Sequence, residues 1–178
     1  MGINLKKNIV LLGMMGVGKS TIGKLLSKKL KMKFVDTDTE IEKKMKMTIP
    51  QIFKQRSEAF FRAKEKDVAS QFLNNHNQVI ALGGGTFLNR EIRDNVKKNS
   101  MSFYLYLNNF EIFKRIKLSK KQRPLLPRGK EMKNIASIVK KRETFYKKAM
   151  FKLNCNYLNK GQVVNKLIKI YKNETFNN

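Results

Sequence analysis

The composition of this chain limits both its architecture and its class of function. With 178 residues it is long enough for one domain with a substantial core and too short to divide comfortably into two, so we expect a single domain over residues 1–178. No run of about 18 uncharged apolar residues is present, and the single cysteine excludes an internal disulfide. The formal charge of +26 is spread as lysines along almost every segment, which disfavours a specific nucleic-acid partner. From the single cysteine and the lack of an apolar span we expect a cytoplasmic protein without a membrane partner, and we expect a monomer.

Five short apolar runs predict the strands of a sheet. They are NIVLLG at 8–13, KFVDTD at 33–38, QVIALGGG at 78–85, MSFYLYL at 101–107 and LNCNYL at 153–158. Helical patterns lie between them: Ile22, Leu25, Leu26 and Leu30 fall on one helical face, and residues 162–171 repeat that spacing. Strands that alternate with helices predict a doubly wound α/β sheet, which binds its ligands beyond the carboxyl ends of the strands.

The first strand run leads directly into a glycine-rich loop. Gly13, Gly18, Lys19 and Ser20 fit the phosphate-binding pattern G-x-x-x-x-G-K-[ST]. In that pattern backbone N–H groups face phosphate oxygens, the lysine reaches the β- and γ-phosphates, and the hydroxyl binds Mg²⁺. The alternative is a tight turn without a ligand, which the agreement of so many positions disfavours.

Two aspartates follow the second strand run. Side chains two residues apart in an extended strand share a face, so Asp36 and Asp38 are expected to approach one site. One would help to hold Mg²⁺ through water, and the other would accept a hydrogen bond from a substrate hydroxyl. A helix that begins at Asp38, with an aspartate as its cap, explains the same pair equally well.

The segment SEAFFRAKEKD at 57–67 places three charged residues on one helical face. Glu58, Arg62 and Glu65 are spaced i, i+4 and i+7. The spacing alone favours a solvated salt-bridge stripe. The functional alternative is that Arg62 binds a carboxylate bidentately while the glutamates orient its guanidinium.

Three later features are ambiguous by themselves. The triplet Gly83, Gly84 and Gly85 follows the third strand run and would let a ligand approach the backbone closely. Residues 119–131 contain two prolines, a glycine and many cations, which predicts an exposed loop that is either a lid or an ordinary solvated connection. Arg142 lies on a predicted helix and, without other information, is only a surface cation.

In their order along the chain, these segments resemble the shikimate kinases. The resemblance rests on GMMGVGKST, FVDTDTEIE, SEAFFRAKE, LGGGT, RPLL and RETFYKKA, and it covers about residues 8–170. It implies the nucleoside monophosphate kinase fold, with a five-stranded parallel sheet flanked by helices and a mobile lid at about 119–131. It also implies transfer of the ATP γ-phosphoryl group to the 3-hydroxyl of shikimate, in aromatic amino-acid biosynthesis.

The resemblance further implies a role for each matching residue. The family's ATP loop matches Gly16, Val17, Gly18, Lys19, Ser20 and Thr21, with Ser20 as the Mg²⁺ ligand. Asp36 would assist the metal through water, Asp38 would bind the substrate hydroxyl as the candidate base, and Arg123 would be the lid arginine over the phosphates. The family's substrate contacts match Arg62, Gly83, Gly84, Gly85 and Arg142, of which the two arginines bind the carboxylate.

The sequence departs from the family pattern at three places. Ser57 stands where the family usually has glycine, and Ala81 offers no side-chain oxygen to a metal-bound water. The arginine expected near adenine, seven residues before the lid arginine, is displaced: Arg115 lies eight before it, and Lys117 is another candidate. Residues 159–162 would also touch adenine in the family's manner.

Two rival functions remain open at this stage. The first is a kinase of another small acceptor, such as gluconate or a nucleoside monophosphate. Adenylate kinases usually have glycine between the loop lysine and the threonine, where this chain has Ser20. The second is a noncatalytic protein whose basic surface binds nucleic acid, against which the joint presence of the loop lysine, the aspartate and three arginines argues.

Overall fold

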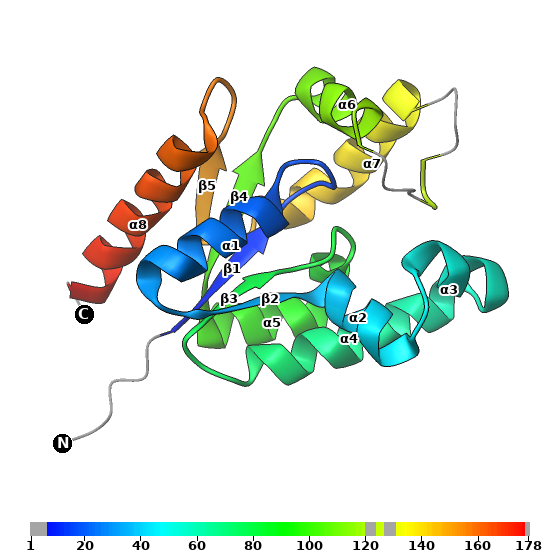
Figure 1. The fold of residues 1–178 in the computed structure, drawn as a ribbon, viewed down its shortest axis with the longest axis horizontal. Helices are drawn as coiled ribbons and strands as arrows, with labels where there is room; N and C mark the ends of the chain where they lie inside the picture. Colours follow the sequence, from blue (N-terminus) through cyan, green and yellow to red (C-terminus); the bar gives the residue numbers. More distant parts are fainter. Residues whose placement is uncertain (1–6, 120–123, 127–130, 177–178) are drawn as a thin grey trace.

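The sheet of this protein has five parallel strands in the order β2-β3-β1-β4-β5 (Figure 1). The computed structural model describes residues 7–119, 124–126 and 131–176. The strands are β1 (Asn8–Leu12), β2 (Lys33–Asp36), β3 (Gln78–Ala81), β4 (Ser100–Tyr106) and β5 (Phe151–Asn154). The predicted fold class, a five-stranded parallel sheet flanked by helices, is confirmed.

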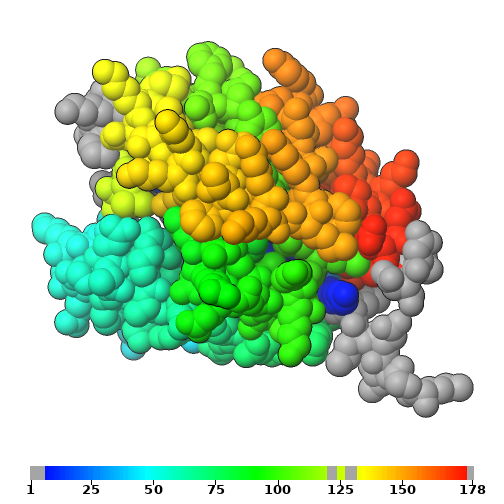
Figure 2. Space-filling view, turned by 180° about the vertical axis from the view of Figure 1, so that it is seen from behind, coloured from blue at the N-terminus to red at the C-terminus, as the bar shows by residue number. Residues whose placement is uncertain are grey.

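Helices cover both faces of the sheet. They are α1 (Lys19–Leu30), α2 (Thr37–Met45), α3 (Ile49–Gln55), α4 (Glu58–Leu73), the 3-10 turn η1 (Thr86–Leu88), α5 (Arg90–Asn99), α6 (Asn109–Lys117), α7 (Glu131–Tyr146) and α8 (Lys160–Phe176). In Figure 1, α1 and α8 lie on the near side of the sheet, and the view from behind in Figure 2 shows α5 in green and α7 in yellow and orange on the opposite side. No helix among the described residues combines the length and the apolar character that a membrane crossing requires.

The central strands read as continuous apolar runs because both of their faces are covered. Every residue of β1 and β3 is buried. In the register, Val10 of β1 lies opposite Ile80 of β3 and Ser102 of β4. These strands therefore form a rigid base on which the loops at their carboxyl ends are held.

Two details of the sequence prediction are wrong. The fifth strand ends at Asn154 rather than at residue 158, because the chain turns after Cys155 and Tyr157 has a positive φ of 61°. On α1, Ile22 and Leu26 are buried, whereas Leu25 is 40% exposed. A 3.6-residue period cannot bring Leu25 and Leu26 equally onto the sheet, and Leu25 falls at the solvent side.

Candidate active site

The glycine-rich loop joins β1 to α1 and forms the floor of the site. Gly13, Gly16 and Gly18 have φ angles of 137°, 85° and 99°, a region that favours a residue without a Cβ. The Lys19 ammonium donates to the carbonyl oxygens of Gly13 at 2.7 Å and Met14 at 3.2 Å. The loop thus presents a lysine and the amino end of α1 to the same space, an arrangement that suits a phosphate chain.

Asp36 lies at the end of β2, next to this loop. Its carboxylate accepts hydrogen bonds from the backbone N–H groups of Asp38 at 3.1 Å and Thr39 at 3.4 Å, and so caps α2. Its second oxygen accepts a hydrogen bond from the Ser20 hydroxyl. The two aspartates do not share a face of an extended strand, because Asp36 ends β2 and Asp38 lies in α2, but both line one cavity, as expected. The expected aspartate cap is Asp36, and the helix begins one residue before the predicted Asp38. The cap satisfies the free N–H groups of the first turn, so the helix begins directly at Thr37.

Asp38 lies in the first turn of α2 and faces the glycine triplet. A Cβ atom at Gly83 would lie 2.5 Å from an Asp38 carboxylate oxygen, 2.6 Å from Glu65 Oε1 and 2.9 Å from Thr86 Oγ1. The Gly83 N–H donates to the Thr37 hydroxyl at 2.9 Å, which joins the start of α2 to the triplet. The missing side chain at Gly83 is what allows the two carboxylates to approach the triplet so closely.

Arg62 lies between two glutamates with very different surroundings. Its guanidinium nitrogens lie 2.9 Å from Glu58 Oε1 and 2.6 Å from Glu65 Oε2, and the side chains of these glutamates are 55% and 3% exposed. Burial lowers the pKa of Arg62, but the Glu65 and Glu58 carboxylates outweigh it and raise that pKa above its ordinary value. The solvated stripe favoured by the spacing is wrong, because Glu65 turns inward and accepts a hydrogen bond from the Thr86 hydroxyl at 2.8 Å.

Arg142 is buried on α7, although in the sequence it resembles any other surface cation. Only 7% of the residue is exposed, and no carboxylate of the described residues forms an ion pair with it. The Tyr146 hydroxyl, one helical turn later, lies beside its guanidinium. A desolvated guanidinium without a counter-ion is unfavourable, so Arg142 is poised for an anion.

Backbone donors of the glycine triplet complete this region. Among the described residues, no group accepts a hydrogen bond from the backbone N–H of Gly84 or Gly85. A Cβ atom at Gly84 would lie 3.0 Å from Arg142 Nη1, and one at Gly85 would collide with the Arg62 guanidinium. The triplet therefore brings two free N–H donors and two guanidinium groups to one place.

Two cavities meet at this edge of the sheet. The loop cavity, of about 290 Å³, is lined by the glycine-rich loop together with Lys19, Ser20 and Asp36. The arginine cavity, of about 100 Å³, is lined by Arg62 and Arg142 and by apolar side chains. Met15, Asp38 and Gly84 line both cavities. An anion on the loop and a carboxylate on the arginines would thus have Asp38 between them.

The comparison with known proteins agrees with this geometry. A family model described as shikimate kinase matches residues 15–172. The chain belongs to the shikimate kinase family. A shikimate kinase from Caldicellulosiruptor saccharolyticus is 41% identical over 165 residues, which are 93% of this chain and 95% of the relative.

Solved structures agree with the family and with the fold. The shikimate kinase from Acinetobacter baumannii in complex with shikimate has a TM-score of 0.90 and 30% identity, over 95% of this chain and 94% of that chain. Thymidylate kinase from Candida albicans, at 16% identity and a TM-score of 0.57 over 96% of this chain and 93% of that one, shares the fold alone.

A third cavity, of about 730 Å³, also borders the glycine-rich loop. Its lining includes Gly16, Arg115, Asn159 and Lys160, and it therefore contains part of the predicted 159–162 segment. The Arg115 guanidinium donates to the Val17 carbonyl at 3.3 Å and also lines the loop cavity. Of the two adenine candidates, the structure brings Arg115 to the loop, whereas Lys117 lines none of these cavities.

Part of the predicted site lies outside the described residues. This is so for Arg123, the predicted lid arginine, and for most of the segment 119–131. The described part, 124–126, includes Leu126, which is 8% exposed, while Pro124 and Leu125 line the arginine cavity. The described part of this segment thus contacts the site rather than extending into solvent.

Sequence reasoning missed two residues of the site. Thr37 is fully buried and connects Asp38 to the glycine triplet, and Tyr146 is 1% exposed and donates a hydrogen bond to the Gly84 carbonyl. A threonine between two aspartates was a usable signal for the first. The position of Tyr146 four residues after Arg142 was a signal for the second, since residues at i and i+4 lie on one helical face.

Proposed function

We propose that this chain transfers the γ-phosphoryl group of ATP to the 3-hydroxyl of shikimate, giving shikimate 3-phosphate and ADP. The observation on which the proposal depends is that the loop cavity and the arginine cavity share Met15, Asp38 and Gly84. A triphosphate on the loop and an anionic polyol on the arginines would therefore meet beside one carboxylate. Phosphoryl transfer requires such positioning and charge neutralisation more than covalent chemistry by the protein.

The arginine cavity supplies the groups that recognise the acceptor. Shikimate has one carboxylate and several hydroxyls. The buried guanidinium of Arg142 and the oriented guanidinium of Arg62 suit the carboxylate, because arginine donates two parallel hydrogen bonds to it. The free N–H groups at Gly84 and Gly85 suit the hydroxyl oxygens.

Asp38 is the proposed base for the reaction. Its carboxylate would accept the proton of the 3-hydroxyl as the hydroxyl oxygen forms a bond to the γ-phosphorus. The bond between this phosphorus and the β,γ-bridging oxygen breaks at the same time, and ADP leaves. Lys19 would neutralise charge that develops on the phosphate oxygens, and we assign the same role to Arg123.

A magnesium ion fits the oxygen groups beside the loop. The Ser20 hydroxyl and the Asp36 carboxylate are in hydrogen-bond contact, and both are ligand types that Mg²⁺ accepts directly or through water. Among the described residues no group of three or more His, Cys, Asp or Glu side chains could hold a metal by itself, so the remaining ligands would be phosphate oxygens and water. When bound, the ion would neutralise the β- and γ-phosphates.

The remaining expectations belong to the same proposal. We propose that residues 1–178 act as one domain and that the segment 119–131 closes over the phosphates and excludes water. We also propose that the enzyme is a monomer in the cytoplasm with no nucleic-acid or membrane partner.

The proposal is tested by measuring ADP release in the presence of shikimate, gluconate and nucleoside monophosphates. Wild type should use shikimate, and Asp38→Asn should lose about 10²- to 10⁴-fold in kcat through loss of the base. Lys19→Ala should be severely impaired as well. Asp67→Asn is the matched control, since Asp67 is an exposed carboxylate on α4 whose side chain is 63% accessible.

Three results would each contradict part of the proposal. Activity with a nucleotide or gluconate but not with shikimate would identify a different acceptor. Full activity of Asp38→Asn would remove that residue from the mechanism. Salt-sensitive DNA binding without shikimate-dependent ADP release would favour the noncatalytic alternative.

A further inference from the structure

A buried tyrosine lies beside both Arg142 and the glycine triplet of the arginine cavity. Tyr146 is the last residue of α7, and its hydroxyl donates a hydrogen bond to the carbonyl of Gly84 in the loop after β3. The same hydroxyl lies beside the Arg142 guanidinium, since a Cβ atom at Gly84 would lie 3.7 Å from this hydroxyl and 3.0 Å from Arg142 Nη1. One phenol oxygen thus contacts both the buried arginine and the glycine triplet.

The orientation of the hydroxyl follows from the chemistry of its neighbours. It donates to the Gly84 carbonyl, and because a guanidinium only donates, the hydroxyl can offer Arg142 only its oxygen lone pairs. Burial raises the pKa of Tyr146 to about 12, although Arg142 opposes this shift. The phenol therefore keeps its proton at neutral pH and donates it to the carbonyl throughout the usual assay range.

The two contacts orient groups on opposite sides of the hydroxyl. On one side, the hydroxyl oxygen lies beside the planar guanidinium of Arg142 and limits its rotation. On the other side, the hydrogen bond to the Gly84 carbonyl fixes the peptide between Gly84 and Gly85. Because this peptide is trans and planar, a carbonyl that points to Tyr146 directs the Gly85 N–H the opposite way.

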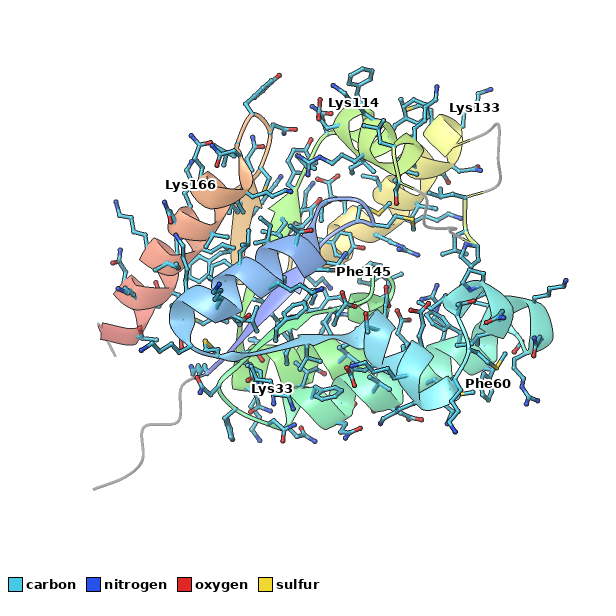
Figure 3. The ribbon with its side chains drawn as sticks, in the orientation of Figure 1. Lys33, Phe60, Lys114, Lys133, Phe145 and Lys166 are labelled. Carbon is cyan, nitrogen blue, oxygen red and sulfur yellow. The ribbon has the colours of Figure 1, made fainter. Side chains whose placement is uncertain are left out.

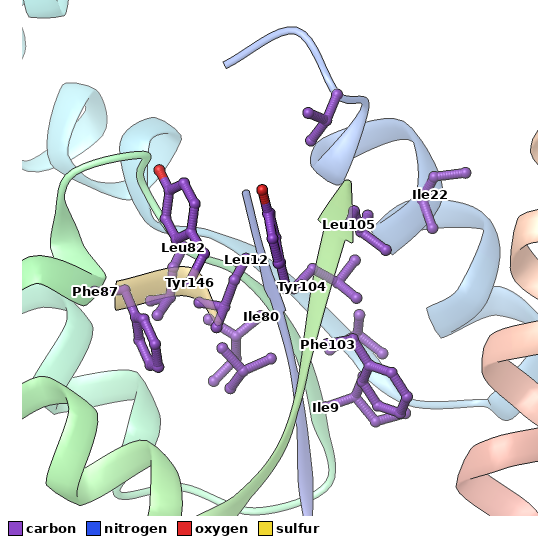
Figure 4. Packing of buried hydrophobic residues seen from close by; sticks show 14 of the residues in the cluster. Ile9, Leu12, Ile22, Ile80, Leu82, Phe87, Phe103, Tyr104, Leu105 and Tyr146 are labelled. Atoms are coloured by element: carbon purple, nitrogen blue, oxygen red, sulfur yellow. The ribbon is translucent and has the colours of Figure 1, made fainter. Parts of the chain in front are cut away.

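The ring of Tyr146 is held in place independently of its hydroxyl. It packs 5.2 Å, between ring centroids, from the ring of Tyr104 on β4. Figure 4 shows both rings beside Leu12 and Leu82, with their hydroxyl groups at the same end. The hydroxyl can thus be removed while the packing of the ring is retained.

We propose that Tyr146 is a positioning residue for the acceptor, whose hydroxyl aligns the Arg142 guanidinium and the Gly84–Gly85 peptide for binding shikimate. This inference rests on the proposed function. It assigns Tyr146 no contact with the substrate and no proton transfer. Its loss should weaken acceptor binding far more than nucleotide binding, because the glycine-rich loop does not depend on the phenol.

The test is steady-state kinetics of Tyr146→Phe with shikimate and ATP varied separately. We expect a roughly tenfold rise in KM for shikimate, the order of effect of losing one buried hydrogen bond, with KM for ATP within about twofold. Tyr104→Phe is the matched control, since it removes a hydroxyl from the neighbouring buried ring and should change neither KM. Circular dichroism and the melting temperature should remain near wild type in both variants.

A double-mutant cycle with Arg142→Lys separates positioning from packing. In the Arg142→Lys background, Tyr146→Phe should cost much less than in wild type, because the phenol no longer aligns a guanidinium. Equal costs in both backgrounds would overturn the proposal, as would equal rises in both KM values or an unchanged KM for shikimate. If wild type itself fails to phosphorylate shikimate, the proposed function fails first and the inference fails with it.

Discussion

At the scale of single residues, the two glutamates beside Arg62 show how strongly burial changes the contribution of an ion pair to stability. Glu58 and Glu65 lie on the same helix and contact the same guanidinium, but the first side chain is 55% exposed and the second 3% exposed. An exposed pair gains little because water solvates both charges. A buried carboxylate has lost that hydration and depends on its partners.

This difference gives a prediction for a matched pair of substitutions. We expect Glu65→Gln to lower the free energy of unfolding by about 1–3 kcal/mol, since it leaves the buried partners imperfectly satisfied. Glu58→Gln should lower it by less than about 1 kcal/mol. Urea denaturation measures both changes, and kinetics should show the larger rise in KM for shikimate in Glu65→Gln. Equal effects of the two substitutions would contradict this account of Arg62.

At the scale of elements, capping side chains fix the starts of α2 and α4, two helices of the site. The Ser57 hydroxyl accepts a hydrogen bond from the Phe60 N–H at 3.1 Å at the start of α4, and Asp36 does the same for α2. The interpretation of Ser57 as a helix cap is confirmed. These caps hold Asp38 in the first turn of α2 and Arg62 at the start of the second turn of α4.

The cap of α4 gives a prediction about stability rather than chemistry. Ser57→Ala should lower the free energy of unfolding by about 1 kcal/mol, because one N–H group of the first turn loses its acceptor. Ser57→Gly should lower the free energy of unfolding by only about a few tenths of a kcal/mol. Chemical denaturation of the three proteins measures the order, and kcat should change little in either variant. A larger loss for glycine than for alanine would contradict the capping role.

At the scale of the whole molecule, the net charge of +26 is a source of self-repulsion. The lysines labelled in Figure 3, Lys33, Lys114, Lys133 and Lys166, come from β2, α6, α7 and α8, and all four are exposed. The charge is therefore distributed over the surface. Salt would screen repulsion of this kind over the whole molecule, since the Debye length falls from about 30 Å at 0.01 M to about 10 Å at 0.1 M.

The expected result is that added KCl stabilises the fold and weakens nucleotide capture. Between about 10 mM and 200 mM KCl, a range over which screening changes strongly, the urea midpoint should rise. Over the same range KM for ATP should also rise, because attraction of the anion is screened. Phosphate buffer must be avoided, since phosphate would bind the glycine-rich loop and stabilise the protein by mass action. A midpoint that falls with KCl would show that attractive ion pairs outweigh the repulsion.

The sequence by itself determined the features that depend on local pattern. Continuous apolar runs predicted the central strands. The glycine-rich loop was evident because the spacing of its glycines, lysine and serine is complete within residues 13–20. The ordered motifs also identified the family. Patterns of this kind are local because backbone geometry fixes which neighbours share a face.

Only the tertiary structure decided which charged groups are buried and what they contact. Helical spacing put Glu65 on a stripe that resembled a solvated one, and spacing alone did not distinguish Arg142 from the other cations, although the family resemblance did. Their burial depends on Thr86, Gly84 and Tyr146, which come from other segments of the chain. The free energy of a charge is set by the water that it loses and the partners that it gains, and both are supplied by segments distant in sequence.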